Sequence, residues 1–208
     1  MHSALNLPTD SDEALLRASF VDSDEARALL VAALAAPAPR SRVLALRGLV
    51  RHDVVTDDQW RGALGDPDVT VRREALTQVS QVTASDDVKD LVVALLNDED
   101  ALVVEGAAFA IGEFVYLGGL SPLLEIAAQH DDARCREAAI AALGALGDDA
   151  ARAVIIGALD DKPPVRRRAI VALAAFEGPD IEAALARASD DRDWQVRAAV
   201  SQLGRDED

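Results

Sequence analysis

The sequence predicts an all-α solenoid, in which about six helix pairs stack in a row behind one capping helix. A short motif recurs six times. Its anchor positions are 42, 72, 104, 136, 166 and 197, at steps of 30, 32, 32, 30 and 31 residues. This period is typical of supersecondary units that stack because none can bury its apolar face alone. Apolar residues recur at helical spacing inside each copy, and glycine, proline and aspartate stand between the apolar segments.

The motif itself predicts a helix with one apolar face. Its fullest copy begins at Val165 and places Arg166, Ala169, Ile170 and Leu173 at i, i+3, i+4 and i+7. This spacing puts the four residues on one side of a helix, whereas a strand would alternate. The other copies begin at positions 41, 71, 103, 135 and 196.

An aspartate-rich turn precedes each of the later motif helices, and another apolar segment precedes each motif helix. Aspartate is a strong N-cap because its carboxylate accepts the free amide hydrogens of the first turn. Pro163 and Pro164 suit a helix start, where a missing amide hydrogen costs nothing. We therefore expect a first helix in each pair, at about 23–36, 57–65, 86–96, 119–129, 148–159 and 179–188.

A further helix is expected near residues 10–20. It begins in the capping sequence Asp10-Ser11-Asp12-Glu13 and would cover the exposed face of the first repeat. A repeat array needs no internal boundary, so we expect a single domain over residues 1–208. It would consist of the cap, 1–21, and repeats at about 22–52, 53–84, 85–117, 118–147, 148–177 and 178–205.

The aspartate-rich turn followed by Val-Arg-x-x-Ala-Ala-x-Ala-Leu-Gly resembles the HEAT-repeat family, in the short variety first noted in phycobilisome lyases. The match covers about residues 22–205. The resemblance implies a right-handed α-solenoid whose motif helices line the concave face. It also implies an internal ladder in which the anchor arginine pairs with a turn aspartate: Arg72 with Asp66 or Asp68, Arg166 with Asp160 or Asp161, and Arg197 with Asp191 or Asp193. The third copy departs from the pattern because its anchor is Val104.

The charge of the chain excludes several classes of partner. Its 37 acidic and 21 basic residues give a net charge of −16. This acidity is even, since residues 1–104 and 105–208 each carry −8. Such a field repels nucleic acids and anionic membranes. The sequence has neither a signal-peptide pattern nor an apolar run near the ~18 residues of a membrane span. We expect a cytoplasmic protein that binds neither nucleic acid nor membrane.

The sequence contains no pattern of catalytic, metal-binding or cofactor-binding residues. The histidines, His2, His52 and His130, lack the adjoining glutamates of the HEAT-repeat di-iron hydroxylase. Cys135 replaces the valine of other copies, so we interpret it as a small buried hydrophobe. Phosphate-binding Gly-Lys loops and Gly-x-Ser-x-Gly elbows are also missing. We therefore expect no cofactor, no metal and no enzyme activity.

Enzyme and nucleic-acid alternatives stay open at this point. Glu105 and Glu113 are the carboxylates of a motif helix that could serve as acid and base. A bilin-lyase-like function has the closest subfamily resemblance, but aromatic residues make up only 3% of the chain. A repeat protein that binds alkylated DNA would need a basic concave face, which the net charge opposes.

We predict a non-enzymatic module that binds a protein or peptide partner on the concave face. The partner would offer an acidic side chain to arginines and an apolar group to Phe109, which lies five residues after its anchor. Phe114 is expected in the core, whereas Trp60 and Trp194 could be core or contact residues. The predicted contact residues are Arg47, Arg51, Arg73, Glu105, Phe109, Glu113, Arg167, Arg168 and Trp194.

Overall fold

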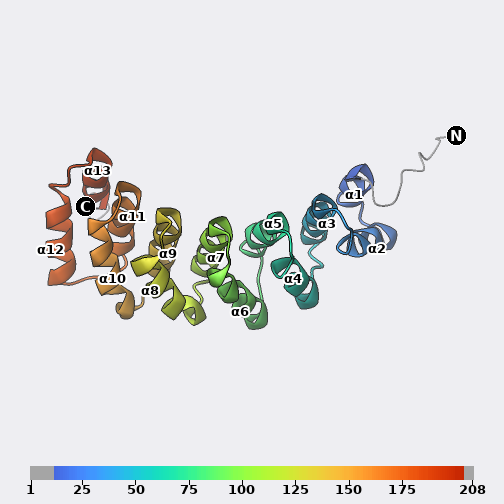
Figure 1. The fold of residues 1–208 in the computed structure, drawn as a ribbon, viewed down its shortest axis with the longest axis horizontal. Coiled ribbons are helices and arrows are strands. Elements are labelled where there is room, and N and C mark those ends of the chain that lie inside the picture. Colours follow the sequence, from blue (N-terminus) through green and yellow to red (C-terminus); the bar gives the residue numbers. More distant parts are fainter. Residues whose placement is uncertain (1–11, 204–208) are drawn as a thin grey trace. The chain divides into compact units, whose positions relative to one another are not determined.

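The computed structural model describes residues 12–203, and every regular element in this range is a helix (Figure 1). Asp10 and Ser11 of the predicted cap, His2, and the end of the sixth repeat lie outside the described residues. The α-helices are α1 (Asp12–Ala18), α2 (Asp24–Ala33), α3 (Pro39–Arg51), α4 (Asp57–Leu64), α5 (Val69–Val79), α6 (Asp86–Ala94), α7 (Ala101–Phe114), α8 (Leu120–Gln129), α9 (Ala133–Leu146), α10 (Arg152–Gly157), α11 (Pro163–Leu173), α12 (Pro179–Ala188) and α13 (Trp194–Leu203).

These helices confirm the predicted pairs. The first helices are α2, α4, α6, α8, α10 and α12, and the motif helices are α3, α5, α7, α9, α11 and α13. Three of the first helices have 3-10 turns at their ends: Leu95–Asn97 follows α6, Leu117–Gly119 precedes α8, and Asp149–Ala151 and Ala158–Asp160 flank α10. Such turns commonly end short helices.

The turn aspartates cap the motif helices as predicted. Asp100 accepts the amide hydrogens of Leu102 and Val103, and Asp132 accepts that of Arg134. Helix α11 instead begins with the predicted proline pair.

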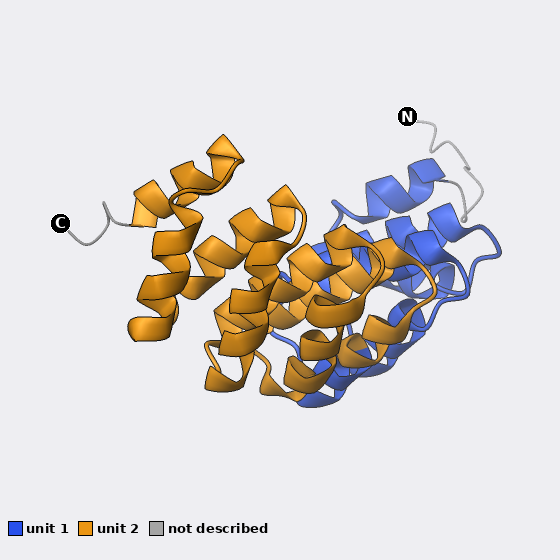
Figure 2. Cartoon of the chain, turned by 60° about the vertical axis from the view of Figure 1, so that its left-hand side comes forward, with its two compact units in different colours: residues 1–91 blue, residues 92–208 orange. Residues whose placement is uncertain are grey.

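The chain divides into two compact units, residues 1–91 and 92–208 (Figure 2). In the first unit, α3 packs against α1, α2 and α5, and α4 packs against α5. Leu15 and Ala18 of α1 are buried in one cluster with Leu30 and Leu49. The capping helix therefore covers the apolar face of the first repeat, as expected.

In the second unit, motif helices of successive repeats pack closely side by side, α7 on α9, α9 on α11, and α11 on α13. Motif glycines permit this approach. A Cβ on Gly112 would lie 3.1 Å from the Cα of Ala142, and one on Gly144 would lie 2.7 Å from the Cβ of Ala172. A larger residue at either position would push the helices apart.

The anchor arginines connect consecutive turns within each unit. Arg166 donates to the carbonyl oxygen of Asp161 in its own turn at 2.7 Å. It also donates two hydrogen bonds, of 2.9 and 2.7 Å, to the carboxylate of Asp191 in the following turn. The same two-pronged pairing joins Arg42 to Asp66 and Arg136 to Asp161.

The internal ladder exists, and Asp66, Asp161 and Asp191 take part in it as predicted, but the arginine of the same repeat contacts their backbone carbonyls and not their carboxylates. Arg72, Arg166 and Arg197 donate to backbone carbonyls of their own turns, on Asp66, Asp161 and Asp191. The carboxylates bound by Arg42, Arg136 and Arg166 belong to the next repeat. The anchor stands at the start of the motif helix, where stacking brings the next turn alongside it. Arg166 thereby holds the pKa of Asp191 below its ordinary value, and Arg136 does the same for Asp161.

The third and fourth repeats are joined differently. The anchor here is Val104, which is buried, and His130 occupies the place that Asp66 and Asp191 hold in other turns. The Nδ1 atom of His130 accepts the amide hydrogen of Asp132 at 3.0 Å. Asp66 and Asp191 accept the equivalent amide hydrogens through Oδ1. Val104 and His130 thus replace the arginine and the aspartate of one ladder pair, while His130 still accepts the amide hydrogen of the turn.

Candidate functional site

The exposed side of α7, α9, α11 and α13 carries three large apolar side chains. We call this surface the motif face of the second unit. Phe109 is 57% exposed, Val171 50% and Trp194 67%. Phe109 and Val171 both lie five residues after their anchors, and Trp194 opens α13. The predicted exposure of Phe109 is confirmed, and Trp194 proves to be a surface residue.

A cleft between α11 and α13 holds two of these side chains. Its volume is about 280 Å³, and Val171 and Trp194 form its apolar wall. Arg167 and Arg168 line the same cleft. Arg167 donates to the side-chain oxygen of Gln195 at 3.0 Å, and the nearest carboxylate oxygen to Arg168, on Glu137, is 3.7 Å away. Both arginines are held in place by weak partners that a stronger acceptor could replace.

The charges on the motif face of the second unit are separated along it. Glu105 and Glu113 extend from α7, with Glu105 half-buried and Glu113 exposed, whereas the two arginines extend from α11. Arg134 on α9 is already paired with Asp132 at 2.7 Å. Glu105 and Glu113 lie eight residues apart on one helix, or about 12 Å along its axis at 1.5 Å per residue. A segment crossing this face would meet glutamates first and arginines later.

In the first unit, two of the predicted arginines already have partners. Arg47 donates two hydrogen bonds, of 2.7 and 2.6 Å, to the carboxylate of Glu74. The guanidinium of Arg51 lies 4.3 Å from the centre of the Phe20 ring. Arg73 is exposed on α5, and its side chain has no ion pair within residues 12–203. An acidic partner would have to displace Glu74 to reach Arg47.

Two other residues singled out in the sequence, Trp60 and Cys135, lie in the interior, whereas Phe114, expected in the core, lies at its edge. Trp60 is 4% exposed and packs in the core, so it is not a contact residue. Cys135 is fully buried as expected, and burial raises the pKa of its thiol to about 11. Phe114 is half-buried at the end of α7.

The cleft itself was not predicted, although Trp194, Arg167 and Arg168 were. Sequence reasoning missed Val171 and Gln202, which complete its wall. The recurring exposed position five residues after the anchor could have identified both of them.

Within residues 12–203, no three side chains of histidine, cysteine, aspartate or glutamate are grouped as metal ligands. Across the same range, no helix has the length and hydrophobicity needed to span a bilayer.

These features define a helical-repeat protein with an exposed apolar and charged face on its motif helices. A family model of HEAT repeats matches residues 120–204, which confirms the resemblance found in the motif. A comparison with curated protein sequences found no match.

Similar solved structures cover most of the chain. YibA of Escherichia coli is 21% identical with a TM-score of 0.63, over 91% of this chain and 73% of that one. The CpcE–CpcF complex of phycocyanin lyase from Nostoc is 20% identical with a TM-score of 0.63, over 84% and 74%. A designed armadillo repeat protein in complex with the peptide (KR)4 is 14% identical with a TM-score of 0.59, over 92% and 97%. These likenesses confirm the helical-repeat fold.

Proposed function

We propose that this chain is a non-enzymatic interaction module that binds a protein or peptide segment on its motif helices. The observation that carries the proposal is the cleft between α11 and α13, where exposed Trp194 and Val171 stand beside Arg167 and Arg168. A large aromatic side chain on a rigid helix is the usual kind of binding anchor. Because exposed apolar surface costs free energy in water, a partner that covers it gains affinity.

The arginines select the chemistry of the partner. Arg167 and Arg168 can each replace a weak contact by a two-pronged pair with a carboxylate. The expected segment therefore carries an acidic residue close to an apolar one. Charge would set its orientation and association rate, while the buried aromatic contact would supply affinity.

Phe109 extends the contact to the far side of the unit. It lies on α7, which is separated from α13, the helix of Trp194, by three steps along the row of motif helices α7, α9, α11 and α13. Packed helices are spaced by about 8–10 Å, so a partner that touches both spans about 24–30 Å. An extended chain rises about 3.3 Å per residue, which gives a segment of about 7–9 residues.

The designed armadillo protein that was solved with the (KR)4 peptide supports a peptide-binding use of such helical repeats. The net charge of −16 supports the further proposal that this chain binds neither nucleic acids nor anionic membranes. We place it in the cytoplasm.

The proposal is tested by selecting displayed random nonapeptides on the immobilised protein. We expect enriched peptides to pair an acidic with an apolar residue, and to lose at least tenfold in affinity for the double variant Phe109→Ala, Arg167→Glu. The matched control is Arg187→Glu, which changes the same charge on a first helix. Equal recovery by the double variant and the wild type would reject the motif face as the binding site, provided that both melt at the same temperature.

A bilin-lyase-like or other enzymatic function is the alternative, and the likeness to the phycocyanin lyase complex is the observation that favours it. The absorbance spectrum and iron content of the protein purified from its native host distinguish the two. A visible absorption band or stoichiometric iron would favour the enzyme.

A further inference from the structure

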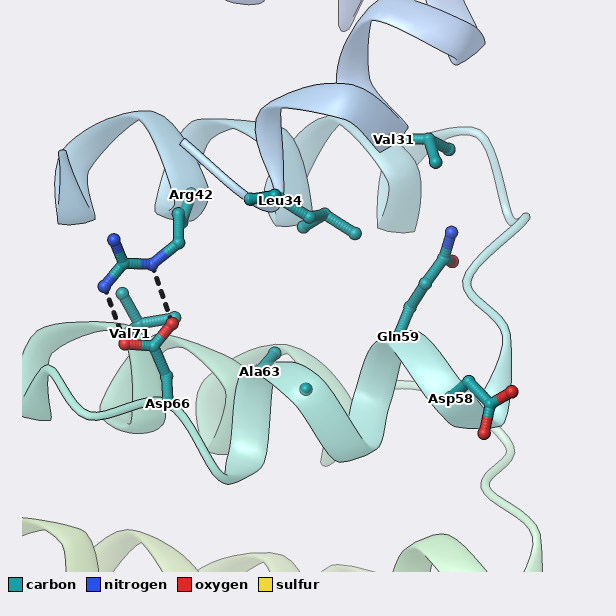
Figure 3. Close-up of a pocket in the computed structure, with 10 residues that line it drawn as sticks. Val31, Leu34, Arg42, Asp58, Gln59, Ala63, Asp66 and Val71 are labelled. Atoms are coloured by element: carbon teal, nitrogen blue, oxygen red, sulfur yellow. Dashed lines mark hydrogen bonds and ion pairs between the residues drawn. The ribbon is translucent and has the colours of Figure 1, made fainter. Parts of the chain in front are cut away.

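A second cleft lies in the first unit, between the first helices α2 and α4 (Figure 3). Its volume is about 320 Å³. Val31 of α2 forms one wall together with Leu34 and Ala35, which follow the end of that helix, and Gly62 and Ala63 of α4 form the other. Val31 is 45% exposed although it is a large apolar residue. The cleft can therefore accept an apolar side chain from outside.

Gly62 keeps this cleft open. It lies inside α4, where glycine costs about 0.5–1 kcal/mol relative to alanine. No packing contact requires glycine here, because a Cβ on Gly62 would meet no heavy atom within 4 Å. The missing side chain leaves space in the cleft, and it is not needed to let two helices pack closely.

The two ends of the cleft differ in charge (Figure 3). At one end, Arg42 and Asp66 neutralise each other through hydrogen bonds of 2.7 Å. At the other end, Asp58 is 93% exposed, and Arg61 binds its Oδ1 atom at 2.7 Å. The second oxygen of Asp58 faces solvent beside the apolar walls. Together with the net charge of −16, this carboxylate favours a cationic group next to the apolar one.

The corresponding cleft between α8 and α10 differs from the α2–α4 cleft in the polarity of its walls. It also lies beside a ladder pair, Arg136 and Asp161, and it also contains a glycine with open space, Gly157. Its walls, however, are mainly polar, with Gln129, His130 and Asp160 among the lining residues. The apolar walls thus set the α2–α4 cleft apart.

We propose that the α2–α4 cleft docks an apolar side chain of a partner peptide whose neighbouring residue is lysine or arginine. This site is distinct from the motif face of the second unit, because it lies in the first unit, between first helices, and prefers the opposite charge. The chain would then hold two segments of different chemistry at once.

The test uses three fluorescent peptides on a Gly-Ser background and fluorescence anisotropy with the full chain. The first has leucine flanked by two arginines, the second has serine in place of leucine, and the third has glutamates in place of the arginines. We expect saturable binding of the first peptide. The dissociation constants of the other two peptides should be at least fivefold larger. Equal binding of all three peptides, or no binding of the first at millimolar protein, would overturn the proposal.

Variants of the protein locate the site. Gly62→Leu places an apolar side chain in the cleft, where its Cβ meets no heavy atom within 4 Å, and should weaken binding of the first peptide at least tenfold. The matched variant Gly157→Leu should leave this binding unchanged. Val31→Lys should weaken it as well, and Asp58→Lys should reverse the preference between the arginine and glutamate peptides. Wild-type affinity in both Gly62→Leu and Val31→Lys would overturn the α2–α4 assignment. None of these substitutions alters the motif face, so the selection experiment described above is unaffected by them.

Discussion

At the scale of single residues, the guanidinium group explains why the anchor of five of the six repeats is arginine. One side chain must reach a backbone carbonyl of its own turn and both oxygens of a carboxylate in the next turn, as Arg166 does. The planar fork of arginine provides these donors in fixed directions, while lysine provides a single point charge. At 4% exposure, the Arg166 side chain is shielded from water, and its carboxylate partner Asp191 is only 14% exposed.

Replacing Arg166 by alanine should therefore lower the free energy of unfolding by about 1–3 kcal/mol, because Asp191 would lose its charged donor. Urea denaturation followed by circular dichroism measures this difference. Arg168→Ala is the control, since its side chain is 43% exposed and its contact with Glu137 is 3.7 Å long. We expect that control to change stability by less than about 0.5 kcal/mol. Similar losses in both variants would contradict a special role for the ladder.

At the scale of helices, local patterns were sufficient to predict the pairs but not their partners across repeats. Apolar spacing and aspartate caps placed the motif helices within a few residues, because both signals act inside one helix. The carboxylate that Arg136 binds, Asp161, stands 25 residues further along the chain. Several turn aspartates compete for that role, and only the stacking of two repeats decides between them.

The same limit applies to the candidate binding surface. Exposure of Phe109 followed from its position in the motif, which every copy shares. The clefts between α11 and α13 and between α2 and α4 depend on the shape of two neighbouring helices. Their apolar walls contain residues such as Val31 and Val171. Valine is equally typical of an ordinary core, so the residue type alone does not predict that these side chains line a cleft.

The unusual link between α7 and the turn before α9 gives a prediction at this scale. Val104→Arg alone should destabilise the chain, because a buried guanidinium would meet His130 in place of a carboxylate. His130→Asp supplies that carboxylate, so the double variant should recover the loss. We expect a coupling free energy of about 1–3 kcal/mol in a double-mutant cycle measured by urea denaturation. Additive effects would show that the two positions do not form a ladder pair.

At the scale of the whole molecule, two electrostatic effects oppose each other. A net charge of −16 destabilises a folded chain through self-repulsion, and this repulsion weakens toward the isoelectric point near 4.5. The ladder carboxylates act in the other direction, because Asp161 and Asp191 stabilise the fold only while they are ionised.

The pH dependence of the melting temperature separates these effects. The pKa values of Asp161 and Asp191 are lowered in the folded chain by Arg136 and Arg166, relative to about 3.9 for an unfolded aspartate. A lowered pKa means that the stabilisation is complete above the unfolded value and is lost as the pH falls through the folded value. We therefore expect a melting temperature that is level or rises from pH 7 to about 5, and falls steeply below about pH 4.

The variant Asp191→Asn provides the internal comparison for this profile. It should melt below the wild type at pH 7, because Arg166 loses a charged acceptor, and the difference should shrink in acid as the wild-type carboxylate is protonated. A difference that stays constant down to pH 2.5 would show that the ladder carboxylates do not control acid stability. A steady decline of the wild type between pH 7 and 5 would instead assign acid sensitivity to groups other than the ladder carboxylates.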